Sequence, residues 1–224
     1  GRENREKVRE AKRPVINAGN GIRIGKAFDV FQRVVEMLGI PVVTGWNSLD
    51  CMYDSHPLYV GRAGHMGDRP GNFAVQNCDL LLSLGSRLSI RQVGYNYPTW
   101  AREAYVIYND IDAEELKKPT VHVDMPVHAD VKDLLEKMEM VLEVEAVSAD
   151  GGPKDKEAVD WWISRCQQWK EKYPVVLPKH YEAGEDQPAN IYAAIKEISR
   201  RLRRIRSLWS ETVPPAWWAV MPTR

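Results

Sequence analysis

The sequence predicts an α/β fold: a parallel sheet doubly wound by helices over residues 13–142, followed by a C-terminal helical extension. Short apolar runs alternate along the chain with amphipathic helical stretches. The runs are apolar at successive positions, which is typical of strands covered on both faces. Crossovers between parallel strands are right-handed, and the ligands of such sheets lie at the carboxyl ends of the strands.

The first half of this region contains two predicted strands with a helix between them. Residues 14–18 form an apolar run that ends at Gly19-Asn20-Gly21, and residues 41–44 form the second run. A helix is predicted over 26–38, where Gly39 ends it. Its apolar residues are spaced by three and four positions, so they share one face. They are Phe28, Phe31, Val34, Val35 and Leu38.

The second half contains three more predicted strands. A short helix over 73–77 precedes a mostly apolar strand over 79–84. Residues 105–108 and 121–123 are the last two predicted strands, and a helix over 131–142 closes the region. The apolar side of this helix consists of Leu134, Leu135, Met138 and Leu142.

The chain beyond residue 142 is predicted to be a linker and a helix over 143–187. The regular pattern stops over 143–153, which contains two glycines and a proline and is therefore interpreted as the linker. Residues 158–172 are predicted as a helix, and residues 173–187 as irregular. A further helix follows, for which Asn190 is a suitable N-cap. Three tryptophans of the first of these helices are interpreted as packing residues: Trp161, Trp162 and Trp169.

The composition excludes several classes of protein. Lys+Arg and Asp+Glu both number 31 in the 224 residues, so there is no electrostatic case for binding nucleic acid or an anionic membrane. No apolar run approaches the roughly 18 residues that span a bilayer. The charged first residues do not resemble a signal peptide, and three scattered cysteines predict a reduced, cytoplasmic protein. The absence of an initiator Met fits a fragment or a processed chain.

Two loops after predicted strands have residues suited to phosphate. Gly19-Asn20-Gly21 resembles a phosphate-binding turn, although Ile24 occupies the place of the third glycine of the dinucleotide fingerprint. The alternative is a tight turn without a ligand. Arg87 and Arg91 follow the strand over 79–84 and could clamp a pyrophosphate; the alternative is a solvated surface loop.

No catalytic or metal site is predicted within the chain. The five histidines show no ligand spacing, so no metal is expected. The order of residues supports neither a Ser/His/Asp nor a Cys/His arrangement.

These segments resemble the middle domain of acetolactate synthase, a thiamine-diphosphate-dependent enzyme. Residues 13–22 and 39–44 are similar to its first two strands, and 56–64 to its next loop. The most specific stretch is 72–87, which resembles the signature A-x-x-x-A-D-L-x-x-x-x-G-x-R. The later landmarks are Asp110-Ile111-Asp112 and His128-Ala129-Asp130-Val131.

The resemblance implies a six-stranded central domain over 1–142 in a three-domain homo-oligomer, a dimer or tetramer, of branched-chain amino acid biosynthesis. In that family, thiamine diphosphate and magnesium are bound by the first and third domains, and the middle domain binds FAD in a structural role. Here only residues 188–205 resemble part of the third domain, its first helix. The catalytic glutamate and the diphosphate-binding motif are absent, so we expect this chain alone to be inactive.

The FAD contacts that the resemblance implies come from loops at the strand ends. Two departures from the family pattern weaken the case for FAD specifically. Ala63 stands where members often have His, and Ser89 stands where many have Asp. Related members use this domain for ADP or for nothing. The implied contacts are Gly19, Asn20, Gly21, Thr44, Gly45, Trp46, Gly61, Arg62, Ala63, Gly64, Gly85, Ser86, Arg87, Arg91, Asp110, Ile111, Ala129 and Asp130.

The resemblance leaves three functions open. The parent enzyme would decarboxylate pyruvate and join the product to a second 2-oxo acid, or it would be a sibling decarboxylase or carboligase. The chain by itself would be a non-catalytic nucleotide-binding module. A nicotinamide dehydrogenase is disfavoured, because the fingerprint lacks its third glycine and the second strand ends in Thr44 without the expected acid.

The tail over 206–224 is predicted to be a frameshift product. It contains prolines and tryptophans without a steady period, where the family has a strand and a glycine-rich turn. With the wobble bases chosen freely, codons for this tail spell Gly-Asn-Gly and small residues in a shifted frame. We therefore expect these residues not to pack into the core.

Overall fold

The computed structural model describes residues 2–147, 153–182 and 188–201, and its centre is a six-stranded parallel sheet. The strand order is β3-β2-β1-β4-β5-β6, so the order reverses between β1 and β4. This is the order of doubly wound nucleotide-binding sheets, and the predicted fold class is confirmed. The strands are β1 (Pro14–Ala18), β2 (Val42–Thr44), β3 (Tyr59–Arg62), β4 (Leu80–Leu84), β5 (Tyr105–Asp110) and β6 (Met125–His128).

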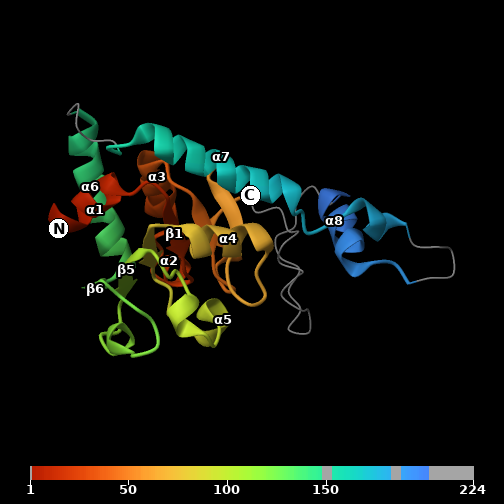
Figure 1. The fold of residues 1–224 in the computed structure, drawn as a ribbon, viewed down its shortest axis with the longest axis horizontal. Helices are drawn as coiled ribbons and strands as arrows, with labels where there is room; N and C mark the ends of the chain where they lie inside the picture. The colour runs from red at the N-terminus through yellow and green to blue at the C-terminus, as the bar shows by residue number, and fades with distance from the viewer. Residues whose placement is uncertain (1, 148–152, 183–187, 202–224) are drawn as a thin grey trace.

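Helices surround the sheet, with α7 running along one side and α1 and α6 lying together at one end (Figure 1). Arg5 of α1 pairs with Glu145 of α6 at 2.8 Å. The α-helices are α1 (Arg2–Glu10), α2 (Gly21–Ile24), α3 (Phe28–Leu38), α4 (Arg69–Asn77), α5 (Ile90–Val93), α6 (Val131–Val147), α7 (Lys156–Lys172) and α8 (Ile191–Arg201). Short 3-10 turns are η1 (Leu49–Cys51), η2 (Tyr97–Thr99), η3 (Glu115–Lys117) and η4 (Pro178–Tyr181).

The core has two halves, one on each face of the sheet. Successive strand residues point to opposite faces, so neighbours along a strand enter different halves. Ile16 of β1 belongs to the half that includes residues of α3 and α6. Its neighbour Val15 belongs to the half that includes residues of α4 and α7. Both side chains are fully buried, which explains why the strands are apolar at successive positions.

The strand β3 corrects the prediction of a loop at this place. Its sequence contains Gly61 and Arg62, which hide the strand pattern. The pairing of β3 with β2 is also irregular, because the register shifts between Val42 and Val43. A short edge strand with a bulge has a weak sequence signal.

The last strand is β6, over 125–128, and the prediction of a strand over 121–123 is wrong. Asp124 accounts for the shift: its carboxylate accepts a hydrogen bond from the backbone N–H of Val106 at 2.8 Å. Its own N–H donates to the carbonyl of Val106 at 3.1 Å. This contact ends the loop at Asp124, and pairing with β5 begins only at Met125. Val121 is buried in the core without pairing.

Several helices also differ from the prediction. The helix α6 continues to Val147, so the first five residues of the predicted linker are helical. The helix α4 begins at Arg69 rather than at 73, because the Asp68 carboxylate caps it by accepting from the N–H of Gly71 at 2.9 Å. The helix α1 was not predicted, since its residues are mostly charged; its C-terminal end is held by the N–H of Lys154, which donates to the carbonyl of Arg9.

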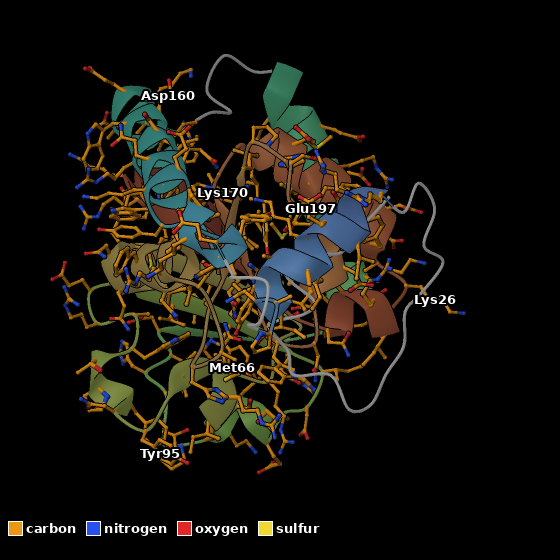
Figure 2. The ribbon with its side chains drawn as sticks, turned by 90° about the vertical axis from the view of Figure 1, so that its right-hand side faces the viewer. Lys26, Met66, Tyr95, Asp160, Lys170 and Glu197 are labelled. Atoms are coloured by element: carbon orange, nitrogen blue, oxygen red, sulfur yellow. The ribbon has the colours of Figure 1, made fainter. Side chains whose placement is uncertain are left out.

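The predicted helix over 158–172 is confirmed as α7, and it packs on the same core as the sheet. The indole Nε1 of Trp162 donates to the carbonyl of Pro14 at 3.1 Å. Near the other end, Lys170 Nζ donates to the carbonyl of Tyr59 at 3.0 Å. Figure 2 shows Asp160 toward one end of α7 and Lys170 toward the opposite end. Trp161 is 59% exposed, which corrects its prediction as a packing residue.

The helix α8 confirms the predicted N-cap. The side-chain oxygen of Asn190 accepts from the N–H of Tyr192 at 3.1 Å and from that of Ala193 at 3.3 Å. The predicted frameshifted tail over 206–224 lies outside the described residues. Within the described part of the chain, no helix has the length and apolar character to cross a membrane.

Candidate nucleotide-binding cleft

A cleft of about 820 Å³ opens at the carboxyl ends of the strands, at the point where the strand order reverses. Its walls come from the loops after β1, β2, β4 and β5. Most of the predicted contact residues line it: Gly19, Asn20, Gly21, Gly45, Trp46, Gly85, Ser86, Arg87, Arg91, Asp110, Ile111 and Asp130.

The predicted residues that do not line this cleft have structural surroundings instead. Thr44 is fully buried, and its hydroxyl lies 3.1 Å from the Tyr59 hydroxyl. Ala129 donates its N–H to the carbonyl of Asp110 at 3.3 Å. Neither residue is among those that line the cleft.

The predicted segment Gly61-Arg62-Ala63-Gly64 does not line the cleft, although Arg62 and Ala63 line a small adjoining pocket with the cleft residues Trp46 and Arg91. Arg62 pairs with the Asp68 carboxylate at 3.0 Å, and only a tenth of the Asp68 side chain is exposed. Gly61 has φ +149°, and a Cβ there would stand 2.3 Å from an Asp68 carboxylate oxygen. The structure therefore explains this segment as the packing around Asp68.

The glycines at the two turns are required because the loops after β1 and β4 touch through their backbones. The N–H groups of Gly19 and Gly21 donate to the carbonyls of Leu84 and Gly85, both at 2.9 Å. A Cβ on Gly19 would lie 2.3 Å from the Gly85 carbonyl oxygen. Gly85 itself has φ +56°, a left-handed conformation that glycine adopts without strain. The glycines thus allow the two turns to approach each other closely where they line the cleft.

A chain of buried amides and a hydroxyl lies beneath the cleft. Gln92 Nε2 donates to Asn17 Oδ1 at 3.0 Å, and Asn17 Nδ2 donates to Ser83 Oγ at 3.1 Å. Gln92 belongs to α5 and follows Arg91 directly. Since Asn17 and Ser83 lie in β1 and β4, this chain fixes α5, and with it Arg91, to the sheet.

Asn109 supplies an acceptor without a partner at the wall of the cleft. Its Nδ2 donates to the carbonyls of Val127 at 3.1 Å and Ala129 at 2.9 Å, so the orientation of the amide is fixed. Its Oδ1 is buried and has no partner in the described part of the chain. A buried acceptor without a hydrogen bond is costly, which is expected where a ligand donor completes the site.

The charged groups of the cleft are held by specific partners. Asp110 accepts from the Tyr108 hydroxyl at 3.0 Å and from the N–H of Asp112 at 2.9 Å. The guanidinium of Arg91 lies 5.4 Å from the centre of the Trp46 ring, a cation–π contact. Arg87 is 78% exposed and pairs with Glu115 at 2.6 Å.

Sequence reasoning missed several lining residues. Asn109 and Gln92 are neighbours of predicted residues, so their signal was the strand-end position itself. Glu115 had no sequence signal, because only the tertiary structure brings η3 against the loop after β4. The remaining ones are Ile24, Gly25, Asn47, Ser48, Leu88, Ser89, Asp112 and Val131.

The described residues offer no activated thiol and no metal cluster. Burial raises the pKa of the Cys51 and Cys78 thiols to about 12, so both are protonated at neutral pH. Cys166 is buried as well, and burial raises its pKa too. No group of three or more His, Cys, Asp or Glu side chains in residues 2–147, 153–182 and 188–201 is placed to hold a metal.

The strand order and the cleft at its reversal define a doubly wound domain of the nucleotide-binding kind. Residues 3–138 match the family model described as the thiamine pyrophosphate enzyme, central domain. The chain therefore belongs to the thiamine pyrophosphate enzyme family, and the resemblance seen in the sequence is confirmed.

Several proteins that are similar in sequence to this chain are named acetolactate synthase or its large subunit. The chain is 34% identical to a probable acetolactate synthase large subunit of Methanococcus aeolicus over 191 residues, which are 85% of this chain and 31% of that protein. It is 35% identical to an acetolactate synthase of Mycobacterium avium over 72% of this chain and 25% of that protein. For the Lactococcus lactis large subunit, the identity is 36% over 73% of this chain and 26% of that protein. The chain thus spans a third or less of the length of these relatives.

Proposed function

We propose that this chain supplies the central domain of an acetolactate-synthase-like enzyme. The match over residues 3–138 and the names of the similar proteins support this proposal. Such an enzyme would use thiamine diphosphate with magnesium to decarboxylate pyruvate and to join the product to a second 2-oxo acid. The groups that hold thiamine diphosphate and magnesium would belong to other domains, in a cytoplasmic homo-oligomer of branched-chain amino acid biosynthesis.

The role we propose for this domain is to bind a nucleotide in the cleft, with FAD as the first candidate. The observation that carries it is the cleft of about 820 Å³ at the reversal of the strand order, which is lined by the glycine turns after β1 and β4. A volume of this size falls within the range of small-molecule and cofactor sites. When bound, FAD would have a structural role, without net redox chemistry.

The residues of the cleft fit the parts of a dinucleotide. Arg87 and Arg91 would pair with the phosphates, near the turn of Gly19 and Gly21. Asp110 would accept from ribose hydroxyls, and Asn109 Oδ1 is an acceptor that still lacks a donor. These fits support a nucleotide; they do not distinguish FAD from ADP.

A second candidate is a nucleotide-binding module that takes ADP in place of FAD. Two departures from the family pattern weaken the case for FAD. Ala63 replaces a histidine that is frequent in the family, and Ser89, which lines the cleft, replaces an aspartate. A titration of the chain with FAD, ADP and NAD separates the candidates: saturable binding of FAD supports the first, binding of ADP alone supports the second, and preference for NAD contradicts both.

Reversing the charge of Arg87 tests the phosphate position. We expect Arg87→Glu to weaken nucleotide binding by more than about 1.5 kcal/mol, because one charged hydrogen bond is lost and repulsion is added. Isothermal titration calorimetry measures the change in affinity. Arg102→Glu is the matched control, since Arg102 is half exposed, pairs with Glu103 and does not line the cleft. Equal nucleotide affinities of the Arg87→Glu and Arg102→Glu variants would contradict a role of Arg87 in binding the phosphate.

The purified 224-residue chain should not form acetolactate from pyruvate with thiamine diphosphate and magnesium. The family's diphosphate-binding motif and its glutamate have no counterpart in this sequence, so no group here activates the cofactor. A colorimetric assay of acetolactate against a control without protein checks the expectation. Turnover above the control would show that the chain carries catalytic groups of its own.

A further inference from the structure

Arg87 already has an anionic partner inside the cleft. Its Nε donates to Glu115 Oε1 at 2.6 Å, and both residues line the cleft. The Arg87 side chain is 78% exposed, whereas that of Glu115 is only 19% exposed. The carboxylate is therefore the more enclosed member of the pair, and the guanidinium is the member that is free to turn.

Glu115 has a second cation that does not depend on Arg87. Lys118 Nζ donates to Glu115 Oε2 at 2.8 Å, and it also donates to the carbonyls of Arg87 and Leu88. Lys118 thereby ties η3 to the loop after β4. The hydrogen bond from Lys118, and after it the one from Arg87, lowers the pKa of Glu115, so the carboxylate is ionised at neutral pH.

A carboxylate and a phosphate compete for the same guanidinium, because both are anions that accept its paired N–H donors. Arg91 is the other cation among the residues that line the cleft, and it lies over Trp46. The cleft also contains three more carboxylates, Asp110, Asp112 and Asp130. An entering phosphate therefore meets an arginine that is already neutralised, in surroundings that are acidic.

We propose that Glu115 is an internal competitor for the anion position at Arg87, which the phosphate of a ligand must displace. The inference rests on the proposed nucleotide site for the identity of that ligand. Once Arg87 turns to the phosphate, Lys118 keeps Glu115 neutralised, so the exchange leaves no unpaired carboxylate. The pairing with Glu115 thus lowers the affinity of Arg87 for the phosphate of a ligand.

The test compares Glu115→Gln with Glu114→Gln. Glu114 is the preceding residue and is 79% exposed; it pairs with Lys117 at 2.7 Å and does not line the cleft, so its variant has the same change of net charge. Inorganic pyrophosphate, ADP and FAD are titrated into each chain by calorimetry. We expect E115Q to bind at least one of them about five- to ten-fold more tightly than the unchanged chain and E114Q, a modest gain because the Arg87 side of the pair is largely exposed.

A second variant is expected to change the ligand affinity in the opposite direction. Lys118→Met leaves Glu115 with Arg87 as its cation, so the same ligands should bind about five-fold more weakly. Thermal melting of all variants checks that each one is folded.

The outcomes separate this inference from the proposed function. If the unchanged chain binds a nucleotide and E115Q binds it no more tightly, the proposed competition by Glu115 is wrong, and the proposed nucleotide site is still supported. If only E115Q binds pyrophosphate, the competition is supported and the nucleotide role of the unchanged chain is wrong. Binding of no ligand by any of these chains contradicts both.

Discussion

Replacing Trp162 by alanine should lower the free energy of unfolding by about 4 kcal/mol, the loss typical of a large aromatic side chain removed from a core. Only 1% of Trp162 is exposed, and its ring meets that of Trp169 edge to face at 5.6 Å. The substitution also leaves the carbonyl of Pro14 without the indole donor. Chemical denaturation followed by circular dichroism measures the change.

The adjacent tryptophan provides the control for this experiment. Trp161 is 59% exposed, so Trp161→Ala should change the free energy of unfolding by less than about 1 kcal/mol. Similar losses for the two variants would mean that α7 is not anchored on the sheet through Trp162. A large difference would establish α7 as part of the folded core, although it follows the predicted linker in the sequence.

A methyl group at Gly19 should destabilise the protein by about 3 kcal/mol, near the upper end for overpacking. The added Cβ would stand 2.3 Å from the Gly85 carbonyl oxygen and 2.4 Å from Ser86 Cα. Both are backbone atoms, so neither can turn aside. The loops after β1 and β4 would have to separate, which would break the hydrogen bond from the Gly19 N–H to the Leu84 carbonyl.

The comparison for Gly19→Ala is Asn20→Ala in the same turn. The Asn20 side chain makes no capping hydrogen bond to α2 and is partly exposed, so its loss should cost less than about 1 kcal/mol. Urea denaturation of both variants gives the two free energies. If Gly19→Ala unfolds at the same urea concentration as the unchanged chain, the close contact of the two turns does not exist in solution.

The sequence was informative about the fold wherever a strand is buried on both faces. Most residues of 79–84 and 14–18 are apolar because they enter one or the other half of the core, and this pattern can be recognised without knowing which elements lie next to the strand. It fails at the two edges of the sheet. There, β3 contains Gly61 and Arg62, and β6 is placed by the contact of Asp124 with Val106, which lies eighteen positions away in the sequence.

The same distinction holds for the cleft. Gly19, Gly21, Gly85 and Arg87 could be predicted because they follow strands directly, and parallel strands bring their carboxyl ends to one edge. Arg62 ends β3 and Gly64 follows it closely, yet neither lines this cleft, because β3 is at the edge of the sheet. Arg62 pairs with Asp68 instead, and the N–H of Gly64 donates to Asn72.

The sequence by itself thus determined the α/β class, the strand ends that form the cleft and the family, since all three depend on local patterns and short motifs. The tertiary structure alone decided three other features: the partner of Arg87, the orphan acceptor of Asn109 and the place of α7 on the core. Each of these is a contact between groups far apart in the chain: Arg87 with Glu115, Asn109 with Val127 and Ala129, and Trp162 with Pro14. Long-range contacts of this kind are set by the packing of whole elements, and no local pattern encodes them.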